Sequence, residues 1–148
     1  MMLALRTRAV GMSERWHRWV DHTSEVQLQM GAESLAGLAA EAGQALGLLL
    51  LRGAPAEPDG PPRTLAVDSA DREALIVDWL NEILFLAEVD LWVPVEFEIE
   101  EASPAHLKAA ARGVPVESPP SNVKAATFHG LRVVETEEGL EAEVIFDV

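Results

Sequence analysis

The sequence contains no cysteine. This absence excludes a disulfide framework, a thiolate zinc site and a cysteine nucleophile, and it fits a reducing compartment. Several catalytic motifs are also missing: there is no GxxxxGK[ST] phosphate loop, no HExxH helix, no GxSxG elbow and no GxGxxG turn after a strand. The sequence therefore carries no signature of the enzyme classes that depend on these motifs.

Basic residues are scarce. The chain has 11 Lys and Arg against 25 Asp and Glu, which gives a formal net charge of −14. Such a chain repels a phosphate backbone unless its basic residues are strongly segregated, so direct binding of nucleic acid is disfavoured. The acidity favours solubility, cation binding or docking to a basic partner, and a well-solvated surface accounts for much of it.

Long hydrophobic runs are absent as well. The apolar run at residues 45–51 is far too short to span a bilayer. The N-terminal segment is interrupted by Arg6 and Arg8 and lacks the continuous apolar core of a signal peptide. We therefore expect a cytoplasmic protein without a membrane segment. Residues 1–13 are expected to form a flexible N-terminal extension, and residues 14–148 a single domain.

Apolar residues at helical spacing predict two helices. The first follows Ser34 as N-cap and covers residues 35–49, where Gly43 and Gly47 weaken it by up to about 1 kcal/mol each relative to alanine. The second covers residues 71–88 and is expected to be capped by Ser69. Its predicted buried stripe comprises Ile76, Trp79, Leu80, Ile83 and Ala87. Asp78 and Glu82 lie one turn apart on another side, as a solvated face or a paired carboxylate site.

Alternating apolar and polar residues predict several strands. These cover residues 26–30, 64–67, 93–99, 106–112 continuing through 114–117, 123–136 and 140–148, with a turn at 137–139. Residues 53–63 are rich in Pro and Gly and are expected to form a loop. Helices lie between strands early in the chain and strands cluster late. This order predicts an α+β fold: a largely antiparallel β-sheet packed by two α-helices.

The polar segment 21–25 lies between apolar, strand-like pieces and has no Gly, Asn-Gly or Pro to favour a turn. Asp21, His22 and Ser24 include the residue types of a catalytic triad. The residues of a triad, however, usually converge from separate parts of a chain. Three close neighbours on one short segment rarely reach that geometry, so we do not expect a Ser-His-Asp hydrolase here.

Asp147 and Val148 end the sequence. If Val148 is the native end, its terminal carboxylate lies one residue from the Asp147 carboxylate. A third carboxylate nearby, such as that of Glu25, would create a repulsion that a cation relieves. Oxygen ligands without cysteine favour Ca²⁺ or Mg²⁺. The alternative is that Glu25 and Asp147 are solvated charges at strand ends.

Four segments in order resemble motifs of the archease family, accessory proteins of the RtcB-type RNA ligase. DHTSEVQL at 21–28 is similar to the family's DHTAD motif and its following strand, and LIVDWLNEILFL at 75–86 to its central helix. VKAATFHGLRV at 123–133 is similar to its KAxT(Y/F)H strand, and VIFDV at 144–148 to its FD-I/V ending. The resemblance extends from about Trp16 to Val148 and implies an archease-like fold.

The resemblance also implies a divalent-cation site formed by Glu25, Asp147 and Val148, with Ca²⁺ as the first choice and Mg²⁺ as the alternative. The family has Asp at the position of Glu25. Glutamate is still a hard oxygen ligand but is one methylene longer. A shifted cation, weaker binding and loss of the cation therefore all stay open.

Further residues match the family motifs. For Asp21, His22 and Thr23 the resemblance implies shaping of the site or contact with the ligase, against the alternative of a polar turn bonded to the local backbone. Lys124 would balance the carboxylates or meet a nucleotide phosphate, against a plain cross-strand ion pair. His129 is a site residue or a structural histidine.

The function implied by the resemblance is that of an activator without catalytic activity of its own. It would promote guanylylation and multiple turnover of an RtcB-type RNA ligase in tRNA splicing or RNA repair. Its partner would be the ligase, with no direct contact to nucleic acid and none to a membrane. Two alternatives stay open: a chaperone or modulator of another RNA-modifying enzyme, and a metal-dependent hydrolase using Asp21, His22 and Glu25.

Overall fold

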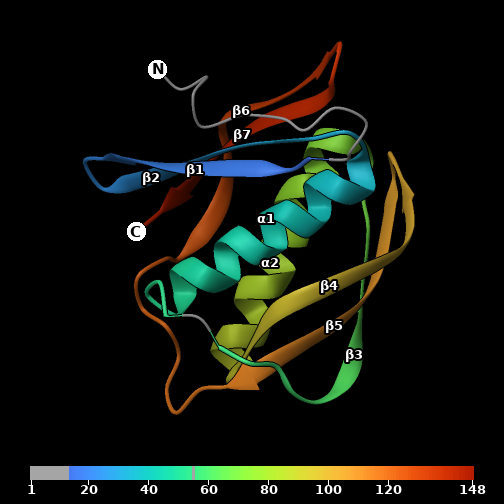
Figure 1. The fold of residues 1–148 in the computed structure, drawn as a ribbon. Helices are drawn as coiled ribbons and strands as arrows, with labels where there is room; N and C mark the ends of the chain where they lie inside the picture. The colour runs from blue at the N-terminus through green and yellow to red at the C-terminus, as the bar shows by residue number, and fades with distance from the viewer. Residues whose placement is uncertain (1–13, 55) are drawn as a thin grey trace.

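The computed structural model of the protein describes residues 14–54 and 56–148, so the extension predicted at residues 1–13 lies outside the described residues. The described chain forms seven strands and two helices (Figure 1). In chain order they are β1 (Trp16–His22), β2 (Glu25–Ala32), α1 (Leu35–Leu50), β3 (Asp59–Asp68), α2 (Arg72–Val89), β4 (Trp92–Ser103), β5 (His106–Pro115), β6 (Ala125–Thr136) and β7 (Gly139–Asp147).

The strands form two antiparallel sheets, one with the order β1-β2-β7-β6 and one with the order β3-β5-β4. The helices lie between the sheets, with α1 against β4 and β2 and α2 against β6 and β4 (Figure 1). The predicted α+β class with antiparallel strands and two helices is confirmed. The division into two sheets was not predicted, because alternation identifies a strand but not its partner.

The predicted stripe of α2 forms the centre of the core. Trp79 is fully buried, and its indole N–H donates a hydrogen bond to the Ala39 carbonyl of α1 at 3.0 Å. Its ring lies 5.9 Å from that of Phe97 in β4. The only polar group of the buried indole therefore has a hydrogen-bond partner, as burial in an apolar core requires.

Two predicted boundaries are wrong. Asp71, not Ser69, is the N-cap of α2, because Asp71 has extended backbone and its carboxylate accepts a hydrogen bond from the Ala74 N–H at 2.8 Å. Ser69 instead donates to Asp78 Oδ2 at 2.5 Å. The loop predicted at 53–63 ends early, because β3 begins at Asp59. This is an edge strand, and Pro61 and Pro62 lie where its ladder with β5 is interrupted, between the pairs Asp59–Gly113 and Arg63–Ala111.

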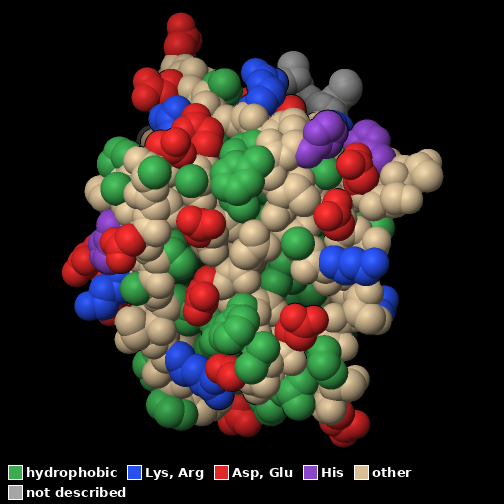
Figure 2. All heavy atoms as spheres, turned by 180° about the vertical axis from the view of Figure 1, so that it is seen from behind, with side chains coloured by type: hydrophobic (Ala, Val, Ile, Leu, Met, Phe, Trp, Pro, Cys, Tyr) green, Lys and Arg blue, Asp and Glu red, His purple; other side chains and the backbone are tan. Residues whose placement is uncertain are grey.

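In Figure 1, α2 lies behind α1, and Figure 2 shows the molecule from that side. Hydrophobic side chains are exposed on this face, with Asp and Glu side chains around them. Within residues 14–54 and 56–148, neither helix is long and apolar enough to cross a membrane.

Candidate functional site

The polar segment 21–25 is the end of β1 followed by a two-residue turn. β1 and β2 pair as an antiparallel hairpin whose last pair is His22 and Glu25, so Thr23 and Ser24 form the turn. Ser24 has a φ of 65°, a left-handed conformation that turns normally give to Gly or Asn. The chain therefore makes this turn without glycine, at a cost of about 1–2 kcal/mol.

The hairpin is held on α1 by a buried carboxylate. Glu41 of α1 is only 9% exposed, and its Oε2 lies 2.6 Å from His17 Nδ1 in β1. Its other oxygen lies 3.3 Å from Arg15 Nε. This cluster attaches the inner face of β1 to α1.

Three predicted site residues form one row across three strands. His22 is paired with Glu25, and Glu25 is paired in turn with Asp147 of β7. Opposed residues of paired strands lie on the same face, and neighbouring strands are about 4.8 Å apart. Buried Leu28 and Val144 belong to the inner face, so the row lies on the outer face, away from the helices.

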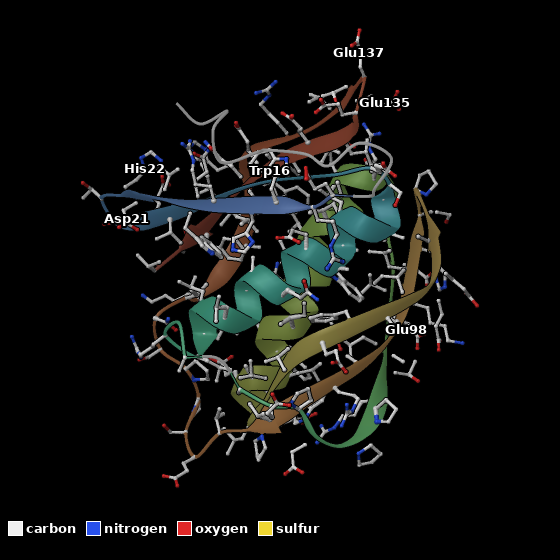
Figure 3. The ribbon with its side chains drawn as sticks, in the orientation of Figure 1. Trp16, Asp21, His22, Glu98, Glu135 and Glu137 are labelled. Carbon is white, nitrogen blue, oxygen red and sulfur yellow. The ribbon has the colours of Figure 1, made fainter. Side chains whose placement is uncertain are left out.

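Asp21 does not join this row. Its register partner is Val26, and successive residues of a strand point to opposite faces, so Asp21 lies on the face opposite to His22 and Glu25. Figure 3 shows Asp21 and His22 at the tip of the hairpin, where both are exposed. The grouping of Asp21, His22 and Glu25 on which a hydrolase would depend is therefore not assembled.

The last residue lies beside the hairpin turn. The Val148 N–H donates a weak hydrogen bond to the Ser24 carbonyl at 3.4 Å, and the Lys124 N–H donates to the Asp147 carbonyl at 2.8 Å. These bonds bring Asp147 and Val148 to the tip where Glu25 begins β2. The Lys124 side chain is exposed and has no ion pair within the described residues, so the cross-strand pair considered for it is not formed.

The Glu25 and Asp147 side chains have no hydrogen bond or ion pair with any described residue. Like charges directly opposite one another on paired strands are destabilising, and a hard cation is the usual remedy. No three His, Asp or Glu side chains within residues 14–54 and 56–148 converge on a point suited to a metal. What the register does bring together are two carboxylates, those of Glu25 and Asp147, on one face of the sheet.

A bulge in β6 separates His129 from this row. Thr127 pairs with Ile145 and Arg132 with Glu143, so residues 128–131 lie opposite the single residue Val144. His129 is exposed in this bulge. It lies four residues along β6 from Ala125, which is the residue that pairs with Asp147. The bulge also exposes Phe128, whose exposed fraction is 61%. The alternation of apolar and polar residues predicts a regular strand over this segment and does not indicate the bulge.

A separate pocket of about 190 Å³ opens on the same outer face. Its lining includes Arg18, Gln29, Arg132 and Glu143, which come from four strands. Arg18 Nε donates to Gln29 Oε1 at 3.1 Å, and Arg132 Nη1 lies 3.8 Å from Glu143 Oε1. Gln29 is four residues along β2 from the carboxylate pair, about 13 Å away. The pocket is therefore distinct from the carboxylate row.

The sequence model of the Archease protein family (MTH1598/TM1083) matches residues 17–148. The chain belongs to the archease family. The matched range includes every residue of the row and the chain end, so the motifs quoted above lie in a recognised archease sequence.

Individual archeases agree with this assignment. The "Protein archease" of Methanosarcina barkeri is 29% identical over 143 residues, which cover 89% of this chain and 95% of the relative. The fold matches the solution structure of Methanobacterium thermoautotrophicum protein 1598, with a TM-score of 0.67, 24% identity, and coverage of 89% and 98%. It also matches the crystal structure of an archease and possible chaperone from Thermotoga maritima, with a TM-score of 0.61, 21% identity, and coverage of 87% and 94%.

Proposed function

We propose that this chain is an activator, not itself a catalyst, that docks on an RtcB-type RNA ligase and promotes its guanylylation and repeated turnover. The reactions served would be RNA joining in tRNA splicing or RNA repair, in the cytoplasm. The observation that supports the proposal is the pairing of Glu25 with Asp147 across β2 and β7, beside Val148 at an exposed end of the sheet. Family membership makes the ligase the partner to test first.

The carboxylates would hold one divalent cation, Ca²⁺ or Mg²⁺, through Glu25, Asp147 and the terminal carboxylate of a chain that ends at Val148. When bound, the cation supplies positive charge and coordination positions for oxygen ligands. The protein contributes the register that fixes both carboxylates on one face. The additional methylene of Glu25, relative to the Asp of the family motif, moves one donor farther from its strand.

Charge also favours docking on a basic surface. The net charge of −14 attracts a positively charged, metal-bearing cleft and increases the rate of encounter. Asp21, Thr23 and Lys124 are exposed around the same tip and are available for contact with the ligase. The proposed role of this end is to enter the cleft and rearrange the ligands around the ligase metal or nucleotide.

The test is GTP-dependent guanylylation of the ligase, measured with and without this protein. The wild type should accelerate it, whereas Asp147→Asn and Glu25→Gln should lose most of the acceleration because each removes one carboxylate. The matched control is Glu98→Gln, which removes an exposed carboxylate from β4 in the other sheet (Figure 3). Acceleration by Asp147→Asn equal to that of the wild type would refute the proposed role of the carboxylate pair.

Cation binding is tested separately by calorimetric titration with Ca²⁺ and Mg²⁺. We expect Glu25→Gln and Asp147→Asn to weaken binding, and Glu25→Asp, which restores the residue of the family motif, to strengthen it. A wild-type protein that binds neither ion, while still accelerating guanylylation, would show that docking does not need the cation.

The alternative is a binding role with another RNA-modifying enzyme. The Thermotoga maritima structure is described as that of a possible chaperone, which favours a binding role in general. Pull-down against candidate enzymes separates the two: capture of another enzyme, without effect on ligase guanylylation, supports the alternative.

A further inference from the structure

Large hydrophobic side chains are exposed on one face of the molecule. In the part of the chain that the structure describes, the exposed large hydrophobics are Leu48, Phe85, Val89, Phe128 and Val148. Three of them belong to α2 and β6, with exposed fractions of 51% for Phe85, 57% for Val89 and 61% for Phe128. Apolar groups that gather on one face and are rimmed by polar residues mark interaction sites.

The outward stripe of α2 contains two of these side chains. Asp78, Glu82, Phe85 and Val89 follow one another at spacings of four, three and four residues, so they share one side of the helix. Phe85 and Val89 are one turn apart and lie side by side. The opposite side of α2 fills the core, and an outward stripe is normally polar throughout. Core packing therefore gives no reason for Phe85 and Val89.

Phe128 lies on the strand adjoining this stripe. The Asn81 side chain binds the backbone of Ala126 in both directions: its Nδ2 donates to the carbonyl at 3.1 Å, and its Oδ1 accepts from the N–H at 2.8 Å. These bonds fix β6 alongside α2, and the bulge two residues further on displays Phe128. Figure 2 shows the molecule from behind, where hydrophobic and acidic side chains are exposed together, with some basic side chains among them.

The α2 part of this face is negative. After Arg72, α2 contains no Lys or Arg but has Glu73, Asp78, Glu82 and Glu88. Arg72 itself lies 3.4 Å from Glu135 and 3.7 Å from Glu73 at the start of the helix. Around Phe85 and Val89, then, the local charge of the helix comes from carboxylates alone.

We infer that this face, formed by Phe85, Val89, Phe128, Glu82 and Glu88, docks a basic amphipathic helix of a partner protein. Such a helix would present apolar residues at i, i+4 and i+7 to the aromatic and aliphatic anchors, and Lys or Arg to the carboxylates. A second copy of this chain would bring acidic stripes together, and a nucleic acid would bring phosphates. The inference goes beyond the ligase role, because it holds whichever protein supplies the helix.

The test uses the full chain and a synthetic helical peptide of about 18 residues. The peptide carries leucines at i, i+4 and i+7 and lysines elsewhere, and a scrambled peptide of the same composition serves as control. Backbone resonances near Phe85, Val89 and Phe128 should shift on titration, and the ordered peptide should bind more tightly than the scrambled one. Added salt should weaken binding because the carboxylates contribute to it.

Variants then locate the site. Phe85→Ser with Val89→Ser should weaken peptide binding by at least about tenfold, as loss of central apolar anchors does. The matched control is Leu48→Ser, an exposed leucine of α1 with an exposed fraction of 40%, which should leave the affinity within about twofold. Thermal unfolding checks that the variants fold, and Phe128→Ser provides the same test if the double variant does not.

Unchanged affinity of the double variant, equal binding of the scrambled peptide, shifts confined to the glutamates of β4, or no binding at all would each overturn the inference. Ligase guanylylation is not measured in this experiment. Failure here therefore leaves the proposed activator role standing, and failure of that role leaves this surface standing.

Discussion

At Gly47 of α1, helix propensity and packing predict opposite effects of a substitution by alanine. On propensity alone, Gly47→Ala should stabilise the helix by about 1 kcal/mol. Yet a Cβ built at Gly47 would lie 2.4 Å from the Pro94 carbonyl oxygen of β4, nearer than such contacts occur. The glycine is there because the helix backbone approaches the strand backbone this closely.

The loss of stability on Gly47→Ala depends on which of the contacting atoms can move away. The obstructing atom is a backbone carbonyl, so no side-chain rotation relieves the contact and α1 must move away from β4. Overpacking of a buried contact costs about 1–3 kcal/mol. After the propensity gain of about 1 kcal/mol, the expected net loss is about 0–2 kcal/mol. For a chain of 148 residues this corresponds to a fall in Tm of up to about 6 °C.

Thermal unfolding followed by circular dichroism, with urea titration at fixed temperature, measures this loss. Gly43→Ala is the matched comparison, because its Cβ would lie 2.6 Å from ring atoms of Phe97, a side chain that can turn. The loss at Gly43 should therefore be smaller than at Gly47. A Tm of Gly47→Ala above that of the wild type would refute the close approach of α1 to β4 as the reason for this glycine.

Three further predictions concern local contacts. His106 donates to Asp68 at 2.6 Å and to Glu101 at 2.9 Å, and these bonds raise the pKa of His106, that to Asp68 most strongly. The stability they contribute is present below the ordinary value of 6.5 and is lost as pH rises through the raised pKa, so His106→Gln should destabilise most at acidic pH in pH-dependent unfolding. Ser24→Gly should stabilise by about 1 kcal/mol in urea titration by relieving the left-handed φ of 65°. Asn81→Ala should destabilise by about 1–3 kcal/mol in the same assay, because it leaves two backbone groups of β6 unsatisfied.

Each of these has a neighbouring control. His129→Gln makes the same replacement at another exposed histidine and is the comparison for His106→Gln. Thr23→Gly places glycine where φ is not positive, so it should lower stability. Glu82→Ala, one residue from Asn81, should have little effect. A pH-independent effect of His106→Gln, a loss at Ser24→Gly, or equal effects at positions 81 and 82 would contradict the corresponding argument.

Periodicity predicted the elements but not their neighbours. The stripe of Ile76, Trp79 and Ile83 identified α2 and its buried side, because helical spacing is a local property. The division into two sheets depends on which strands pair, and pairing is decided by contacts between distant segments. The glycines of α1 show the same limit: from sequence they weaken a helix, and in the structure they allow it to lie against β4.

The sequence proposes members for the candidate site but does not give their geometry. Local composition drew attention to Glu25, and the end of the sequence drew attention to Asp147 and Val148. That His22 belongs to the same row, and that Asp21 does not, follows only from the register of β1, β2 and β7. The residues of a single strand do not determine its register with the neighbouring strands.

The core enforces this register, and so the core places the carboxylates. Phe146 is fully buried, pairs with Val26, and packs against Trp19 with ring centroids 5.5 Å apart. A slip of one residue in β7 would move Phe146 to the solvent face and Asp147 into the core. Burial of a phenylalanine side chain is worth about 1.5–3 kcal/mol, and a buried unpaired carboxylate costs more. The position of Asp147 opposite Glu25 is therefore fixed by the apolar residue that precedes it in the chain.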